Sequence, residues 1–137
     1  MGGRPAFRQW QIWFVPWRND AGGESSRRSL LLSSQRQVDS GILWFACIQG
    51  SRPQNTFFTT IRKADYPDAH ARTGLSYDLC YVNPISLRLL SSDKIGEFAG
   101  ELPLIWHRDV AIKRRAIDAL NEQRRKAGTP TLPAPNP

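Results

Sequence analysis

Arginine is the residue type in this 137-residue chain whose abundance and placement best suit it to chemistry. Nineteen Lys and Arg side chains stand against twelve Asp and Glu, which gives a formal net charge of +7, and most of the nineteen are arginine. The planar guanidinium donates two parallel hydrogen bonds to a phosphate, which the lysine ammonium does not do. The charge therefore favours a polyanionic partner such as RNA. The alternative is a basic protein that contacts no nucleic acid.

The cysteine and histidine residues show no pattern typical of a metal site. Cys47 and Cys80 each lie within an apolar run, ILWFACI and YDLCYV, and we expect both to be buried thiols. Two such thiols are too few for a disulfide framework or a zinc site. His70 and His107 are far apart in the sequence, and we expect both at the surface. These residues give a metal centre little support, and we expect no cofactor.

The elements that must position the arginines are predicted to be mostly short strands. Runs rich in aromatic, aliphatic and Thr residues indicate strands at residues 10–17, 29–34, 42–48, 56–62, 77–82 and 85–90. The stretch RNDAGGESSRR, residues 18–28, reads as a flexible loop of about ten residues, longer than a hairpin needs. Residues 35–41 read as a polar break, and residues 63–74 as an extended loop or a single helical turn. Asp93 is expected to cap a short helical turn through GEFAG, residues 96–100.

Residues 106–126 are predicted to form a C-terminal helix, which Gly128 and Pro130 end. Before and after the elements, residues 1–9 read as a flexible basic arm and residues 127–137 as a disordered Pro-rich tail, which leaves a single domain at 10–126. The pattern favours a mostly β (α+β) fold, a small twisted barrel or half-barrel with one helix packed on it. No apolar run approaches the roughly 20 residues of a membrane span, and no secretory signal is present, so we expect a cytoplasmic protein without membrane contact.

Two blocks of the sequence resemble the MazF/PemK family of ribonuclease toxins. The first reads QIWFVPW, then RNDAGGESS, then RRSLLLSS, and the second reads TGLSYDLCYVNPISLRLLSSDKIGEFAGELP before the helix that holds IKRRAIDAL. With the strand between them, the blocks cover roughly residues 10–120. The resemblance implies an SH3-like barrel of the CcdB/MazF type that forms a homodimer. It also implies metal-independent cleavage of single-stranded RNA, with the RNA's own 2′-hydroxyl as nucleophile, and silencing by an acidic antitoxin.

The resemblance assigns the catalytic roles by position. Arg28 stands immediately before LLLS, where the family arginine stabilises the charge of the reacting phosphate, and Arg27 is placed to assist. The family has a hydroxyl residue at the end of the third strand. Here the text is FACIQG, which puts Gln49 in that position, with Ser51 two residues on as the nearest hydroxyl. Ser29 stands where the family usually has proline.

Three further residues are candidates for binding the substrate. Glu24 lies in the predicted loop, where an acid can orient Arg28 or move a proton, the alternative being a solvated side chain. Trp17 flanks the same loop and can stack on a base, and Arg52 near a strand end can contact a phosphate.

Two functions stay open. A third alternative is an unrelated β-barrel whose likeness to the family is due to chance. The first is a metal-independent endoribonuclease toxin, which Arg28 and the loop favour. The second is a catalytically degenerate barrel that binds RNA without cutting it, or acts on a protein target such as gyrase. Gln49 favours the second, because an amide does not reproduce the proton behaviour of a hydroxyl.

Overall fold

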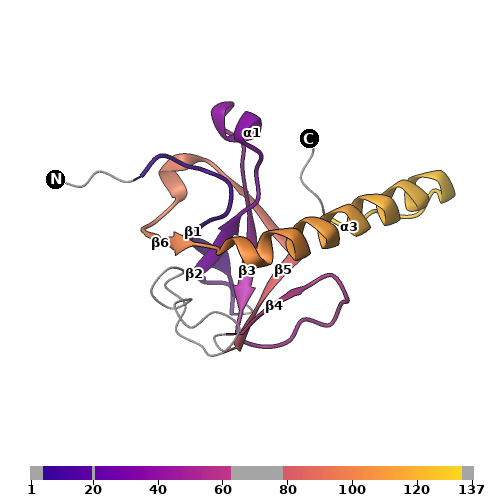
Figure 1. Cartoon of the computed structure of the whole chain (residues 1–137), viewed down its shortest axis with the longest axis horizontal. Helices are drawn as coiled ribbons and strands as arrows, with labels where there is room; N and C mark the ends of the chain where they lie inside the picture. The colour runs from indigo at the N-terminus through magenta and orange to yellow at the C-terminus, as the bar shows by residue number, and fades with distance from the viewer. Residues whose placement is uncertain (1–4, 20, 63–78, 134–137) are drawn as a thin grey trace.

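Six antiparallel strands form one curled sheet, in the order β4-β5-β3-β2-β1-β6 (Figure 1). The computed structural model describes residues 5–19, 21–62 and 79–133. The strands are β1 (Gln11–Arg18), β2 (Glu24–Leu31), β3 (Leu43–Gln49), β4 (Thr59–Arg62), β5 (Leu79–Leu90) and β6 (Phe98–Glu101). The helical elements are α1 (Gln35–Asp39), the 3-10 turns η2 (Ser92–Lys94) and η3 (Leu104–Trp106), and the long α3 (His107–Ala127).

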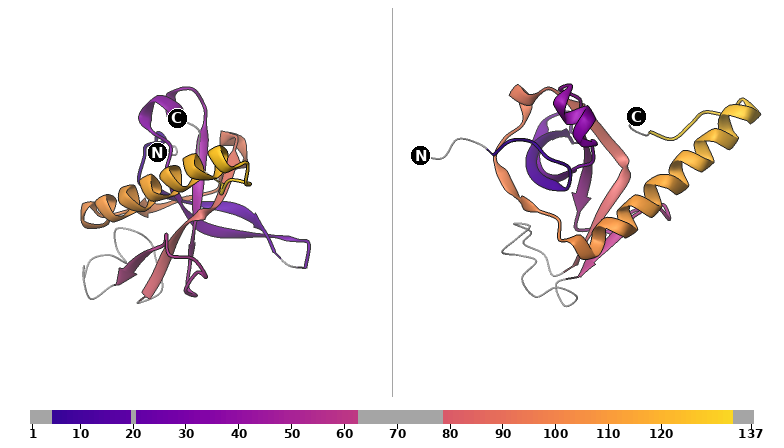
Figure 2. Two further views of the ribbon diagram at one scale, coloured as in Figure 1. Left: turned by 90° about the vertical axis from the view of Figure 1, so that its right-hand side faces the viewer. Right: turned by 45° about the horizontal axis from the view of Figure 1, so that its top comes forward.

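The core consists of two clusters, because alternate side chains of a strand point to opposite faces of the sheet. One cluster is covered by α3 and comprises, among others, Ile12, Leu30, Ala46, Ile48, Ile61, Val82, Trp106 and Val110. The other comprises Trp13, Val15, Leu31, Leu43, Phe45, Leu90 and Ile95. Full burial of each large side chain stabilises the fold by roughly 1.5–3 kcal/mol. The predicted half-barrel with one C-terminal helix is therefore confirmed (Figure 2).

The flexible loop predicted at residues 18–28 is wrong. β1 and β2 pair from Ile12↔Leu30 to Arg18↔Glu24, so most of that stretch is strand. The turn is confined to residues 19–23, where Asn19 N donates to Gly23 O at 2.8 Å and Gly22 has a φ of 89°, a value that favours glycine. The polar residues at the start of β2 have little strand propensity of their own. Pairing with the strongly strand-forming β1 overrides this weak preference.

The hairpin of β1 and β2 extends beyond the rest of the sheet, and this geometry creates the candidate site. The ladder between β2 and β3 has three pairs, Ser29↔Cys47, Leu30↔Ala46 and Leu31↔Phe45. Beyond Ser29 the hairpin bends away from β3 while β2 stays paired with β1 (Figure 2, left). The first half of β2 and the end of β3 therefore face each other across a gap in the ladder.

Helix α1 replaces the polar break expected at residues 35–41. Ser34 caps it, because its hydroxyl accepts from Gln37 N and the Gln37 side chain accepts from Ser34 N. This reciprocal capping box is readable in the sequence as S-x-x-Q, and it stabilises a short helix whose composition is otherwise uninformative.

Two other local predictions also differ from the structure. The strands expected at 77–82 and 85–90 are one strand, β5, which continues through Asn83 and Pro84 with a register shift opposite Ala46 and Cys47. The helical turn expected at 96–100 is instead strand β6, which pairs with β1. Asp93 lies inside η2, and Ser91 is the residue before that turn. Residues 63–74 lie outside the described part of the chain.

The C-terminal helix is confirmed, with Gly128 in the left-handed conformation at its end, at a φ of 72°. Within the tail, the buried Asn121 side chain donates to Leu132 O at 2.9 Å and accepts from Leu132 N at 2.7 Å. The described part of the tail, predicted to be disordered, thus has specific contacts with α3. His107, expected at the surface, is half-buried and stacks on Trp10 with ring centroids 4.2 Å apart.

The described part of the N-terminal arm also contacts the barrel. Phe7 packs on Trp13 at a centroid distance of 4.7 Å, and Arg8 forms an ion pair of 2.9 Å with Glu101. Within the described ranges, no helix has the length and apolar character that crossing a membrane requires.

Candidate active site between β2 and β3

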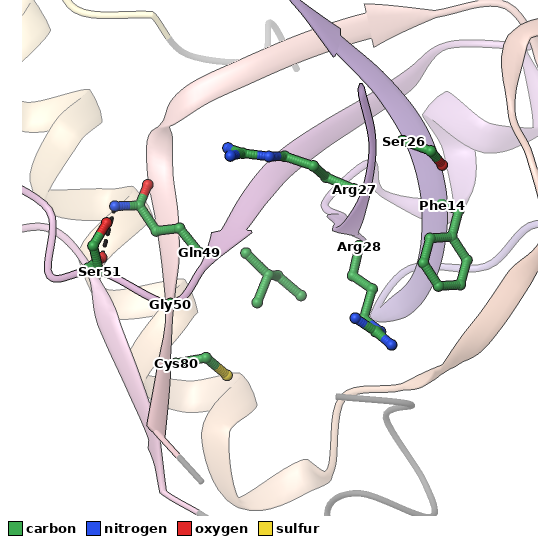
Figure 3. Close-up of a pocket in the computed structure, with 9 residues that line it drawn as sticks. Phe14, Ser26, Arg27, Arg28, Gln49, Gly50, Ser51 and Cys80 are labelled. Atoms are coloured by element: carbon green, nitrogen blue, oxygen red, sulfur yellow. Dashed lines mark hydrogen bonds between the residues drawn. The ribbon is translucent and has the colours of Figure 1, made fainter. Parts of the chain in front are cut away.

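A pocket of about 340 Å³ lies where β2 and β3 separate. Its walls come from β1, β2, β5 and the end of β3 with the two residues that follow, and they comprise Phe14, Ser26, Arg27, Arg28, Ile48, Gln49, Gly50, Ser51 and Cys80. The pocket therefore brings together four residues that the sequence singled out, Arg27, Arg28, Gln49 and Ser51 (Figure 3). Their catalytic roles stay predictions.

Arg28 supplies a positive charge to this pocket, and it forms no ion pair with another described residue. Its guanidinium carbon lies 5.0 Å from the centroid of the Phe14 ring, a cation–π distance. The Arg28 Nε is buried and has no hydrogen-bond partner among the described residues. A buried donor without a partner costs free energy, and a bound anion would satisfy it. No Asp or Glu is among the described residues that line the pocket, and the charges of these residues favour an anion.

Arg27 provides a second cation at the same pocket from the other face of β2. Neighbouring residues of a strand point in opposite directions, and Arg27 extends toward the side of Gln49 whereas Arg28 lies beside Phe14 (Figure 3). Burial raises the pKa of the Cys47 thiol, and the charge of Arg27 and a hydrogen bond from it partly offset that rise. The two guanidinium groups thus approach the gap between β2 and β3 from different directions.

Gln49 is held in place by a network of side-chain amides. Its Nε2 donates to Ser51 O at 2.8 Å, and its Oε1 accepts from Asn83 Nδ2 at 3.3 Å. Asn83 is buried and also donates to Ser86 Oγ at 3.1 Å, while its Oδ1 accepts from Asn55 Nδ2 at 3.2 Å. Gln49 therefore has a fixed orientation with one amide N–H left over to donate to a ligand.

The remaining polar side chains of the pocket are the hydroxyls of Ser26 and Ser51 and the thiol of Cys80. Ser51 is exposed, and its hydroxyl makes no hydrogen bond within the described ranges of the chain. Burial raises the pKa of the Cys80 thiol to about 11, and the nearby charge of Arg28 only partly opposes the rise. A thiol with this pKa is neutral at pH 7 and is not a nucleophile.

Three predicted binding residues lie outside this pocket. The Glu24 carboxylate pairs with Arg88 at 3.2 Å rather than with Arg28, and Arg88 also donates to Pro16 O. Trp17 packs against the second core cluster, and its Nε1 donates to Ser29 Oγ at 2.8 Å. Ser29 stands where the family usually has proline, and its hydroxyl thus holds the Trp17 indole by a hydrogen bond. Arg52 lines a neighbouring crevice.

Sequence reasoning missed Phe14, Ser26, Cys80 and Asn83. Phe14 was readable, because it alternates with buried positions of a predicted strand and so faces the same side as Ile12. Asn83 precedes a proline inside an apolar stretch, which resembles a turn, and nothing local indicates that β5 continues through it. The place of Cys80 in the pocket depends on the pairing of β5 with β3, which sets Tyr81 opposite Gln49 and which the sequence does not specify.

Comparison with known proteins identifies the fold. No protein-family model and no curated protein matches the sequence. A mycobacterial endoribonuclease solved in complex with its cognate antitoxin matches with a TM-score of 0.58 at 15% identity, over 79% of this chain and 90% of that chain. A second mycobacterial endoribonuclease structure matches with a TM-score of 0.56 at 15% identity, over 94% of this chain and 98% of that chain. The Mycobacterium tuberculosis toxin MazF-mt6 matches with a TM-score of 0.59 at 14% identity, over 79% of this chain and 96% of that chain. The predicted MazF-type fold is therefore confirmed.

Proposed function

We propose that this protein is an endoribonuclease of the toxin–antitoxin type, which cuts single-stranded RNA in the pocket between β2 and β3. The observation that carries the proposal is Arg28, a guanidinium with no anionic partner among the described residues, placed across the pocket from Gln49. The similar structures support it, because two are endoribonucleases and the third is a toxin. The formal net charge of +7 suits an RNA substrate.

The reaction is transfer of a phosphoryl group within the RNA. The 2′-oxygen of one nucleotide attacks the adjacent phosphorus, the bond to the 5′-oxygen of the next nucleotide breaks, and a 2′,3′-cyclic phosphate remains. One proton leaves the 2′-oxygen and another is delivered to the departing 5′-oxygen. Negative charge builds up on the non-bridging oxygens, where the guanidinium groups of Arg27 and Arg28 and the free N–H of Gln49 stabilise it.

The proton transfers are assigned to Ser51 and solvent. Among the described residues, the pocket lining includes no carboxylate and no imidazole, and the Cys80 thiol is neutral. The exposed Ser51 hydroxyl both accepts and donates a proton in a hydrogen-bonded relay. Catalysis in this pocket therefore depends mainly on electrostatic stabilisation, which commonly contributes the largest part of an enzyme's rate enhancement.

An acidic antitoxin and a second copy of the chain are the proposed partners. One similar structure is an endoribonuclease bound to its cognate antitoxin. A basic surface attracts an acidic segment and speeds its association.

A second candidate function is RNA binding without cleavage. It is favoured by the fixed amide of Gln49, which stands where the family has a hydroxyl and holds hydrogen bonds to Ser51 and Asn83. In that case Arg27 and Arg28 bind phosphate, and no group activates the 2′-oxygen.

Cleavage of a long single-stranded RNA in EDTA tests the proposal. The wild type is expected to produce a limited set of fragments with 2′,3′-cyclic phosphate ends, and Arg28→Ala to lower the rate by about 10²–10³-fold. Arg36→Ala is the matched control, because Arg36 is an exposed arginine on α1. A folded wild type that binds this RNA but leaves it intact would contradict the proposal and support the second candidate.

A further inference from the structure

A second crevice, of about 360 Å³, lies between β4 and the first two turns of α3. Its size is within the range of small-ligand sites. Arg52 lines this crevice and Ser51 lines the first pocket, so consecutive residues of one turn connect the two hollows. A chain that occupies the first pocket and crosses this turn therefore meets the crevice next.

One wall of the crevice is suited to stacking. The guanidinium carbon of Arg52 lies 5.2 Å from the centroid of the Phe58 ring, and the Trp106 indole closes the wall with only 6% of its surface exposed. Unpaired RNA bases stack on aromatic rings and on arginine planes, because every base has a π-face. This wall therefore suits a base.

The lining of the crevice also includes a carboxylate held by a hydrogen bond, beside an ammonium group. Asp109 Oδ2 accepts from Thr59 Oγ1 at 2.7 Å, and Asp109 Oδ1 lies 3.8 Å from Lys113 Nζ. A carboxylate repels a phosphate, so this part of the crevice is not built for one. It accepts hydrogen bonds from N–H groups, while Lys113 donates to an adjacent acceptor.

We propose that this crevice is a subsite that recognises a guanine base of the RNA strand held in the first pocket, and as a subsite it rests on the proposed function. The Watson–Crick edge of guanine presents two adjacent donors, N1–H and the N2 amino group, beside the acceptor O6. Asp109 receives the two donors and Lys113 donates to O6, while the base lies on the Arg52–Phe58 wall. Adenine lacks this donor–donor–acceptor order, and inosine lacks the amino group.

Binding of uncleavable RNA tests the subsite separately from catalysis. The probes are fluorescent 2′-O-methyl oligoadenosine heptamers with one guanine placed at each position in turn, and matched heptamers with inosine at that position. Fluorescence anisotropy with the full chain is expected to find one position at which guanine binds roughly tenfold more tightly than adenine or inosine. No position with such a preference would overturn the proposal.

Variants of the crevice complete the test. Asp109→Asn keeps an acceptor for Thr59, so it should fold, and it is expected to abolish the guanine preference. Glu122→Gln is the matched control, because Glu122 makes an exposed pair with Arg125 on the same helix and should leave the preference unchanged. Lys113→Met is expected to weaken guanine binding, because it removes the donor to O6 and keeps the Asp109 carboxylate that accepts from the guanine N–H groups. A preference that survives in Asp109→Asn would overturn the proposal.

The outcomes for the subsite and for the proposed function are distinguishable. Guanine-selective binding that Asp109→Asn abolishes, with no cleavage of the 2′-hydroxyl version of the same oligomer, supports the subsite and contradicts the endoribonuclease. Cleavage that is equally efficient with guanine and inosine at every position supports the endoribonuclease and contradicts the subsite. An acidic peptide that binds in the crevice without displacing the RNA oligomer would also overturn the subsite.

Discussion

Arg28 and Phe14 are directly opposite each other in the β1–β2 ladder, and the guanidinium carbon of Arg28 lies 5.0 Å from the centroid of the Phe14 ring. The cross-strand pairing fixes the distance between the two backbones, and the ring then restricts where the long arginine side chain lies. The charge at the pocket is therefore positioned by the hairpin itself and not by an acidic partner among the described residues.

Phe14→Leu is expected to lower the cleavage rate by roughly twofold to fivefold, because the cation–π contact contributes about 0.5–1 kcal/mol to the positioning of Arg28. The measurement is single-turnover cleavage of a short RNA. Phe98→Leu makes the same chemical change on β6, outside the pocket lining, and should leave the rate unchanged. Equal losses in both variants would show that the ring acts through general stability.

Asn83→Ala is expected to reduce the free energy of unfolding by about 1–3 kcal/mol, because it leaves the amides of Gln49 and Asn55 without their buried partner. Urea denaturation measures this loss. Gln123→Ala on the exposed face of α3 should change stability by less than about 0.5 kcal/mol. A loss no larger for Asn83→Ala than for Gln123→Ala would mean that the network carries no net stability.

Gln49→Thr is expected to raise the cleavage rate by at least about tenfold, since it restores a hydroxyl at the end of β3 and positioned proton transfer commonly contributes 10²–10⁴-fold. The variant is compared with Gln49→Val, because valine has nearly the shape of threonine but lacks its hydroxyl. Equal rates for the two would show that the end of β3 takes no part in proton transfer.

The stability of the protein is expected to fall as the pH rises from 9 toward 11. Burial raises the pKa of Cys80 from 9.0 to about 11, so in this window the folded thiol still holds its proton while the unfolded one has lost it. The unfolded state then binds fewer protons, and the free energy of unfolding decreases by at most about 1.4 kcal/mol per pH unit for this one group.

Denaturation of the wild type and of Cys80→Ala across pH 8.5–10.5 checks this expectation. The difference between the two curves isolates Cys80, because lysine and tyrosine residues titrate equally in both proteins. Parallel curves would contradict the raised pKa. The same pKa predicts slow alkylation of the Cys80 thiol at pH 8, with a rate that rises about tenfold per pH unit.

The sequence predicted the elements whose own composition determines their structure. β1 and β3 have long apolar runs, and α3 has apolar residues at helical spacing, among them the buried Val110 and Ile117. The burial of these residues decides where the three elements lie. The polar half of β2 and the short β6 become strands because β1 lies beside each of them. Pairing of this kind depends on the tertiary fold, which local propensity does not record.

The candidate site shows the same division. Arg28 and Gln49 were assigned from the resemblance to the MazF/PemK family, by their places in its sequence pattern, and the structure brings them to one pocket. Glu24 was expected near Arg28 because the sequence favoured a loop there. In a strand, four residues of extended backbone separate the two, and Glu24 meets Arg88 of β5 instead. Contacts between distant strands require the sheet order, which the sequence pattern left open.

The early end of the β2–β3 ladder has an evolutionary consequence. The width of the pocket is set by where backbone pairing stops, at Ser29↔Cys47, and apart from Ile48 and Cys80 the side chains that line it lie outside the two core clusters. Such a scaffold tolerates exchange of its reactive groups at small cost in stability. Catalytic ability can therefore be lost, regained or redirected toward another ligand by one or two substitutions at positions such as Gln49, while the barrel that carries them stays intact.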